Sequence, residues 1–138
     1  MGLNIRVGDK YYYGWPYRSL HELRAFAARK EFPDLPEYTD SVLDSMYKRL
    51  SECKRFKLLI NHSDFDCGYL PDGLEFPRYV EPGSVNRQEW PSAEKLMEEL
   101  KDLKQYYDEM PDEIQEIYGD LLKAAEASIR EVVPMEFM

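Results

Sequence analysis

The sequence lacks any apolar run that could cross a membrane. A membrane-spanning helix needs about 20 consecutive, mostly apolar residues, and charged side chains interrupt the hydrophobic stretches of this chain well before that length. The first ten residues also lack the basic-then-apolar layout of a secretory signal peptide. We therefore expect a cytoplasmic protein with no membrane partner.

Cysteine pairs and familiar catalytic motifs are absent too. The two cysteines, Cys53 and Cys67, do not form a Cys-x-x-Cys pair, so a structural zinc site is not indicated. A reducing compartment also disfavours a disulfide between them. The chain has no glycine-rich phosphate loop and no Gly-x-Ser-x-Gly motif. These absences favour a non-enzymatic protein that needs no cofactor.

Acidic residues, by contrast, are abundant and unevenly placed. The formal net charge is −9, and residues 92–131 hold twelve acids against five bases, a formal −7. Such a surface repels phosphate backbones, so nucleic-acid binding by this half is not expected. The acidic half either attracts a basic protein partner by electrostatic steering or is a solvated face that keeps the protein in solution.

The length and the apolar fraction predict one domain over residues 1–138. A chain of 138 residues, of which 43% are hydrophobic, can bury one core and is too short for two. The sequence does not indicate an oligomeric state.

The hydrophobic periods predict an α+β fold with a small antiparallel sheet. Alternating apolar residues at 3–7, the turn residues Gly8 and Asp9, and a return strand over 10–13 form a hairpin. Glycine at the first turn position is typical of a II′ turn. The apolar run 57–61 predicts a buried strand beside this hairpin, and residues 135–137 predict a short terminal strand.

About four main helices are expected beside this sheet. Ser19 and Glu22 have the spacing of a capping box at the start of the first helix, and a second apolar stripe predicts a helix over 39–53. Ser92 is the expected N-cap of a third helix, and Pro111 begins a fourth with the strongest helical period in the chain. The last two helices are acidic, and we expect them to form an antiparallel helical hairpin.

Residues 62–91 have no clear period and are rich in proline and glycine, which predicts a long irregular segment. A segment of this length inside a small domain is usually functional or mobile. The densest polar cluster of the chain lies at its start. Its members are Asn61, His62, Ser63, Asp64, Asp66 and Gly68.

This motif has two possible roles. His62, Asp64 and Asp66 combine an imidazole with two carboxylates, a ligand set that suits Mg, Mn or Zn. In the other interpretation the two aspartates cap turns through their side chains, and His62 bonds across the loop. We favour this structural role and keep the three residues as candidate metal ligands.

Tyrosine and tryptophan cluster around the predicted hairpin and again before the fourth helix. These side chains favour interfaces because they combine an apolar body with a polar tip. They either face a partner or complete the core. The interface candidates are Tyr11, Tyr12, Tyr13, Trp15, Tyr106 and Tyr107.

The central motif resembles that of a bacterial family without an assigned activity, whose members carry a strand ending in Leu-Leu-Asn-His-Ser-Asp-Cys-Asp-Gly. The chain departs from that pattern at Phe65 and Cys67, and Gly68 comes one place late. Tyr17 and Arg24 also match the family's first helix. The matching motif residues are Leu59, Asn61, His62, Ser63, Asp64 and Asp66. The resemblance implies that the motif is a shared feature and implies no activity for it.

These patterns favour a non-enzymatic protein-binding module of the small acidic inhibitor or immunity type, with a basic protein as its partner. The alternative is a small metal-dependent enzyme or ligand-binding domain centred on His62, Asp64 and Asp66. A convex acidic face would support the first function, and a pocket with converging carboxylates would support the second.

Overall fold

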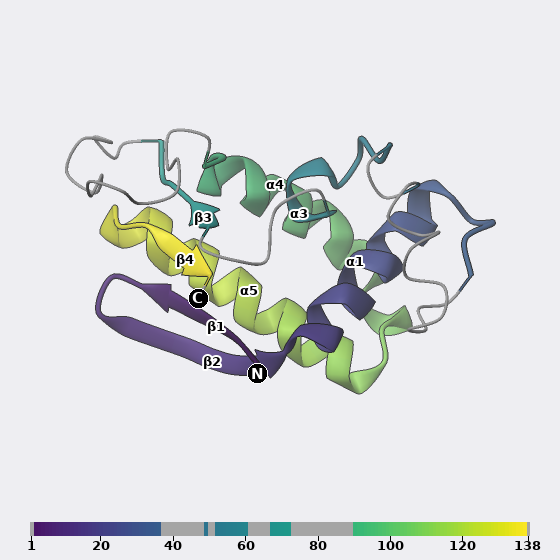
Figure 1. Cartoon of the computed structure of the whole chain (residues 1–138). Helices are drawn as coiled ribbons and strands as arrows, with labels where there is room; N and C mark the ends of the chain where they lie inside the picture. The colour runs from purple at the N-terminus through teal and green to yellow at the C-terminus, as the bar shows by residue number, and fades with distance from the viewer. Residues whose placement is uncertain (1, 37–48, 50–51, 61–66, 73–89, 138) are drawn as a thin grey trace.

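The computed structural model describes residues 2–36, 49, 52–60, 67–72 and 90–137. These residues form a small antiparallel sheet with helices packed against it, which confirms the predicted α+β class (Figure 1). The elements are β1 (Gly2–Val7), β2 (Lys10–Pro16), α1 (Tyr17–Glu31), α3 (Lys57–Ile60), β3 (Cys67–Tyr69), α4 (Ala93–Leu103), the 3-10 helix η4 (Lys104–Glu109), α5 (Asp112–Glu131) and β4 (Met135–Phe137).

The sheet has the strand order β2-β1-β4-β3, with antiparallel neighbours throughout. The β1–β2 hairpin is confirmed, because Val7 pairs with Lys10 across a two-residue loop. Gly8 has a φ of +58°, whereas Asp9 has no positive φ, which is the pattern of the predicted II′ turn. The predicted terminal strand is also confirmed, and as β4 it lies inside the sheet, between β1 and β3.

The predicted strand over 57–61 is wrong. Lys57–Ile60 forms the short helix α3, and β3 supplies the remaining strand of the sheet. A short apolar run does not distinguish a buried strand from a buried helical turn. Glu99 on α4 decides between them, because its two carboxylate oxygens accept the backbone N–H groups of Leu58 and Leu59, each at 3.0 Å.

The helix starts are partly as predicted. Ser92 accepts the Lys95 N–H at 3.2 Å and caps α4, as expected. The capping box at Ser19 is wrong, because α1 begins earlier, directly after Pro16, and the Ser19 hydroxyl donates to Glu113 instead. The predicted second helix, 39–53, falls mostly outside the described residues.

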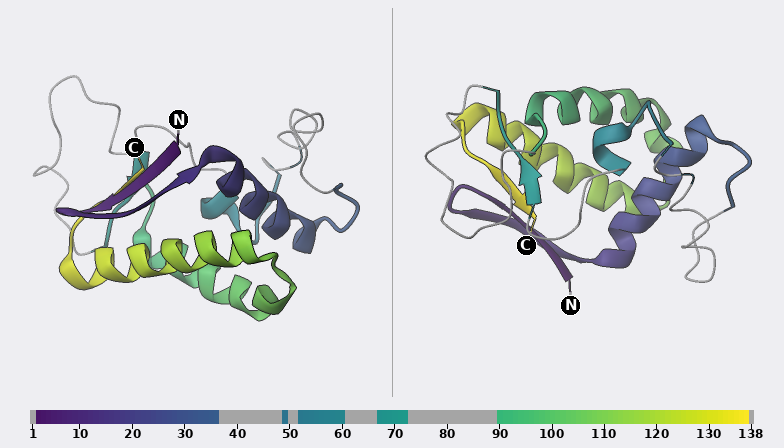
Figure 2. Two further views of the ribbon diagram at one scale, coloured as in Figure 1. Left: turned by 90° about the horizontal axis from the view of Figure 1, so that it is seen from below. Right: turned by 45° about the horizontal axis from the view of Figure 1, so that its top comes forward.

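Helix α5 is the centre of the packing. It contacts α1, α4 and strands β1, β2 and β4, and Figures 1 and 2 show it between the β1–β2 hairpin and α4. Ile117 and Leu121 of α5 and Ile60 of α3 are all buried in the core. The helices therefore hold one long face of α5 against the sheet and α4, and leave the opposite face to solvent.

Helix α5 ends in a strained residue. Val132 has φ 55° and ψ 52°, the left-handed conformation, and its side chain is exposed. L-residues pay about 1–2 kcal/mol there, and β-branched residues are rare in it. The turn is needed because it lets the Val133 N–H reach the Ser128 carbonyl before β4 begins.

We expect Val132→Gly to raise the free energy of unfolding by about 0.5–1 kcal/mol. Glycine adopts the left-handed conformation without a Cβ penalty, and part of that gain is lost to its greater freedom in the unfolded chain. Urea unfolding measures the change. Val133→Gly is the control and should lower stability, because Val133 packs against the core. Destabilisation by Val132→Gly would contradict the left-handed turn.

Candidate functional site

The predicted antiparallel hairpin of acidic helices is present in the structure. Helices α4 and α5 pack together through their apolar faces, and the Tyr118 hydroxyl on α5 donates to the Leu100 carbonyl on α4. Pro111 lies directly before α5, in agreement with the expected start. The buried residues of this contact include Leu96, Leu100, Leu103, Ile114, Ile117 and Leu121. Since the apolar faces point inward, most of the charged side chains point outward.

Some hairpin acids stabilise the fold and are not available to a partner. Asp102 accepts two hydrogen bonds from the Arg55 guanidinium, at 2.8 and 3.0 Å, and this interaction lowers the pKa of Asp102. Glu99 caps α3 through Leu58 and Leu59, and burial raises the pKa of Glu99 despite those two backbone donors. These two carboxylates fasten α4 to the 55–60 segment.

Other hairpin acids tie its two ends to neighbouring segments. Glu113 accepts the Ser19 hydroxyl at 2.7 Å, and Glu109 pairs with the Lys30 ammonium at 2.8 Å, so both bonds connect α1 to the hairpin. At the other end, Glu94 accepts the Asp72 N–H at 2.8 Å. Glu109 and Glu113 remain exposed, so their charges still contribute to the surface potential.

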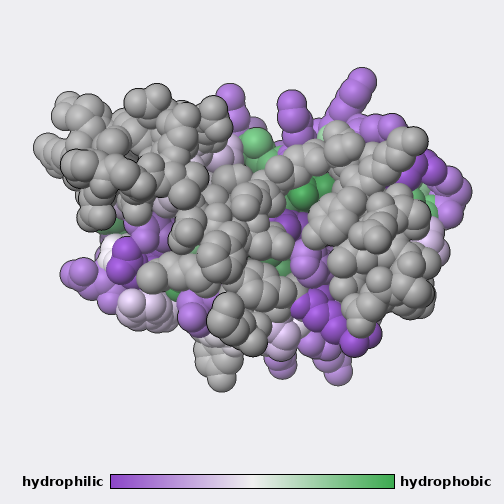
Figure 3. All heavy atoms as spheres, viewed as in Figure 1, coloured by the Kyte–Doolittle hydropathy of each residue, from purple (hydrophilic) through white to green (hydrophobic). Residues whose placement is uncertain are grey.

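A third group of acids is exposed and has neither an ion pair nor a hydrogen bond in the described part of the chain. Its members are Glu98, Asp108, Asp112, Glu116, Glu126 and Glu131. Two of the exposed apolar side chains, Tyr107 and Val132, also lie on or beside the hairpin. On the face drawn in Figure 3, the coloured surface around the margin is mainly hydrophilic, with small hydrophobic areas. This composition favours electrostatic over hydrophobic association.

The highest density of acid lies at one end of the hairpin. Residues 105–122 contain six acids and no Lys, Arg or His. We call these six residues the acidic tip; they are Asp108, Glu109, Asp112, Glu113, Glu116 and Asp120. This base-free stretch is a property of the sequence, although the net charge of residues 92–131 as a whole does not reveal it.

The α5 part of the acidic tip has a regular spacing. At about 100° per residue, Asp112, Glu113, Glu116 and Asp120 fall within an arc of about 100°, which extends from the side opposite Leu121 towards one flank of the buried face. At about 1.5 Å per residue they span about 12 Å, so neighbouring charges are on average about 4 Å apart along the helix axis. One strand of duplex DNA carries a phosphate about every 3.4 Å along its axis. The acidic tip therefore approaches the linear charge density of a DNA strand.

The tyrosine candidates whose side chains the structure describes differ in exposure. Tyr11 on β2 is 62% exposed, and Tyr107 at the acidic tip is 39% exposed, with its ring centroid 5.9 Å from that of Tyr118. Tyr12 and Tyr106 are partly buried and pack against the core. The side chains of the other two candidates, Tyr13 and Trp15, lie outside the described part of the structure.

The polar motif after residue 60 is mostly outside the described residues. Asn61, His62, Ser63, Asp64 and Asp66 all fall there, so their role as metal ligands or turn caps stays a prediction. Among the side chains that the structure does describe, no group of three or more His, Cys, Asp or Glu is placed to hold a metal ion.

The last motif residue, Gly68, lies in β3 opposite Glu136. A Cβ atom at this position would lie 2.0 Å from the Met135 carbonyl oxygen. Glycine is therefore required here for the close approach of two backbones, a role that involves no ligand.

Cys53 is a free, buried thiol, and burial raises its pKa to about 11. A thiol that stays protonated is a poor nucleophile and a poor metal ligand. The described helices include none that is long and apolar enough to cross a bilayer.

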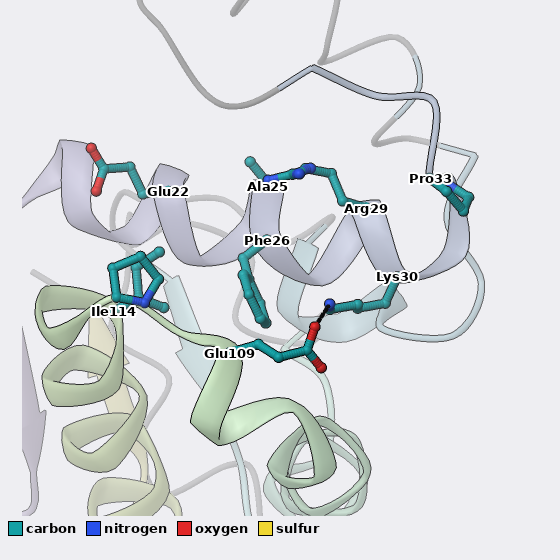
Figure 4. A pocket seen from close by; sticks show the side chains of 9 residues that line it. Glu22, Ala25, Phe26, Arg29, Lys30, Pro33, Glu109 and Ile114 are labelled. Atoms are coloured by element: carbon teal, nitrogen blue, oxygen red, sulfur yellow. Dashed lines mark hydrogen bonds and ion pairs between the residues drawn. The ribbon is translucent and has the colours of Figure 1, made fainter.

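One pocket, of about 570 Å³, lies between α1 and the acidic tip (Figure 4). Phe26, Pro111 and Ile114 contribute its apolar lining, and the Lys30–Glu109 ion pair spans one end. The lining charges balance, since Glu22 and Arg29 complete the charged set. The pocket therefore lacks the converging carboxylates that would indicate a metal-dependent site.

Comparison with known proteins gives one match. The family described as "Putative DNA-mimic protein" matches residues 5–137. No curated protein and no solved structure matches the chain. This match is compatible with the resemblance found in the sequence, which is also to a family without an assigned activity. The match does not test the polar motif on which that resemblance rests. The family description agrees with a protein-binding role for an acidic chain.

Proposed function

The chain belongs to this DNA-mimic family, and we propose that it is a non-enzymatic inhibitor that occupies the DNA-contacting surface of a basic DNA-binding protein. The acidic tip carries this proposal, because six acids without an intervening base lie on one end of a rigid hairpin. This proposal includes the inhibitory role and the cytoplasmic location that the sequence leads us to expect. Its partner is a basic protein that normally contacts phosphates.

Carboxylates can replace phosphates in such a contact. DNA-binding proteins hold the backbone with Lys and Arg, which form charge-assisted hydrogen bonds with carboxylate oxygens as well as with phosphate oxygens. The exposed carboxylates Asp108, Asp112 and Glu116 have no internal partner among the described residues, so a basic surface would not have to break an ion pair to reach them.

The hairpin also presents these charges in a fixed arrangement. Helix α5 is held by buried contacts on α4, α1 and the sheet, so its acidic row does not have to be ordered on binding. Preorganised charges lower the entropic cost of association and speed the encounter with a basic partner. A flexible acidic tail of the same charge would lack this geometry.

The test compares two triple variants with equal loss of charge. Asp108→Asn with Asp112→Asn and Glu116→Gln removes three exposed charges of the acidic tip; Glu98→Gln with Glu126→Gln and Glu131→Gln removes three exposed charges elsewhere on the hairpin. Proteins from a native lysate that the immobilised chain retains, and that duplex DNA releases, are identified and purified. Their association rate is then measured with each variant.

We expect the tip variant to slow association by about tenfold or more, and the matched control by less than about threefold. Binding should also weaken between low and high salt, because exposed charges are screened within about 8 Å at physiological ionic strength. If the two variants slowed association equally, the acidic tip would act only through its net charge and would not be a specific binding site. Retained proteins that duplex DNA does not release would contradict DNA mimicry.

A further inference from the structure

The pocket beside the acidic tip holds a cation of the chain itself. The Lys30 ammonium lies 4.8 Å from the ring centroid of Phe26, 4.7 Å from that of Tyr106 and 2.8 Å from a carboxylate oxygen of Glu109. Two aromatic rings and a carboxylate form a typical binding site for an organic cation. We call Phe26, Tyr106 and Glu109 the cation cage.

The cage is accessible from solvent at its carboxylate. The Glu109 side chain is 59% exposed and that of Lys30 is 21% exposed. An ion pair with so exposed a carboxylate contributes little to stability, because water competes for both charges. The ion pair therefore does little to hold Lys30 in the cage, and the flexible lysine side chain can place its ammonium in solvent when another cation takes its place on the two rings.

We propose that the cation cage and the adjoining pocket receive an arginine side chain of the basic partner, which displaces Lys30. This inference rests on the proposed function, since the acidic tip brings the basic surface to the mouth of the pocket. The guanidinium would stack on the rings of Phe26 and Tyr106 and bind both oxygens of Glu109. Its methylene groups would pack on Pro111 and Ile114.

Arginine fits this site better than lysine for two reasons. A guanidinium is planar, so it can stack on a ring and pair with two carboxylate oxygens at once, whereas an ammonium acts as a point charge. The fold already contains this geometry at the same tyrosine. The Arg55 guanidinium lies 5.2 Å from the Tyr106 ring, bonds to the Tyr106 hydroxyl at 2.8 Å and pairs with both oxygens of Asp102.

The location of the pocket also fits a single anchoring side chain. It lies between α1 and the segment 109–114, directly beside the exposed acids Asp108 and Asp112. Interfaces commonly concentrate their energy in an arginine or aromatic anchor that enters a pocket, surrounded by weaker polar contacts. Here the acidic tip would supply the surrounding contacts.

The probe for this site is a tetra-arginine peptide, with tetra-lysine for comparison, titrated calorimetrically into the full chain. Lys30→Met should tighten tetra-arginine binding by at least threefold, because the internal competitor is gone. Lys104→Met is its matched control, since it removes the same charge from an exposed position on η4 outside the pocket. Glu109→Gln should weaken tetra-arginine binding at least fivefold, and Glu98→Gln much less.

Two results would overturn the inference. One is an equal gain from Lys30→Met and Lys104→Met, which would show that only net charge matters. The other is an equal affinity for the two peptides. Melting temperatures establish that each variant is folded, and Glu109→Gln tests the site independently should Lys30→Met not fold.

The release of partners by duplex DNA is scored separately from these titrations. If duplex DNA releases the partners while the two lysine variants behave alike, the arginine site is wrong and the DNA-mimic function stands. If the peptide results hold while duplex DNA releases nothing, the arginine site stands and the DNA-mimic function is wrong.

Discussion

Replacing Leu121 with alanine should lower the free energy of unfolding by about 2–5 kcal/mol. Leu121 is fully buried in the middle of α5, the helix that contacts α1, α4 and three strands. Deleting its branched end leaves a cavity, and the elements packed around it from several sides cannot all move in to fill it. The lost apolar burial and the remaining cavity therefore both lower the free energy of unfolding. Urea unfolding followed by circular dichroism measures the loss.

The adjacent residue provides a matched control for this substitution. Leu122→Ala removes the same atoms from a partly buried position, so its effect should be clearly smaller. A loss below about half a kcal/mol at Leu121 would mean that α5 does not pack as described. The result also bears on function, because the same packing holds the acidic row of α5 in place.

Replacing Gly68 with alanine should destabilise the protein by about 3 kcal/mol and should separate β3 from β4. The new Cβ would lie 2.0 Å from the Met135 carbonyl oxygen and 3.0 Å from the Glu136 Cα. Backbone atoms inside a sheet cannot move aside as a flexible side chain can, so the added methyl group forces the strands apart. Overpacking of this kind usually lowers stability by about 1–3 kcal/mol, and we expect a clash with the backbone of the central strand β4 to fall at the upper end of that range.

The separation of β3 would also disturb its buried tyrosine. Tyr69 is fully buried, donates its hydroxyl to the Leu58 carbonyl at 2.7 Å, and contacts the Phe137 ring edge-on at a centroid distance of 5.6 Å. Amide hydrogen exchange should therefore show lost protection in β3 and β4 before the helices are affected. This pattern distinguishes a local clash from general destabilisation.

Gly119→Ala is the control for the same chemical change at another glycine. A Cβ at position 119 meets nothing within 4 Å, and the residue lies inside α5. Alanine should be neutral there or stabilise by about 0.5–1 kcal/mol, because it favours the helix more than glycine does. A Gly68→Ala protein as stable as the wild type would show that β3 does not approach β4 as closely as described.

The sequence by itself determined the elements whose evidence is local. The II′ turn at Gly8, the cap at Ser92 and the start of α5 after Pro111 all depend on a few neighbouring residues, and the structure has each of them as expected. The acidic hairpin follows in the same way, since a period of 3.6 residues fixes which side of a helix is apolar. The density of acid at the tip is also a property of the sequence, in residues 105–122.

Only the tertiary structure decided where polar groups from distant segments meet. Glu99 on α4 accepts hydrogen bonds from the backbone N–H groups of Leu58 and Leu59. This contact stabilises a helical turn in an apolar segment whose pattern predicts a strand. Ser19 likewise lies inside α1 and not at its N-cap, and its hydroxyl donates to Glu113 on α5. A local pattern contains no information about partners so far along the chain.

The same distinction applies to the candidate site. Composition supplies the acids, but the fold decides that Asp102 is paired with Arg55 and that Asp112 and Glu116 face solvent without a partner among the described residues. The cation cage around Lys30 also exists only because α1 and the hairpin pack side by side. Charge is a local property of a sequence, whereas its availability depends on three-dimensional neighbours.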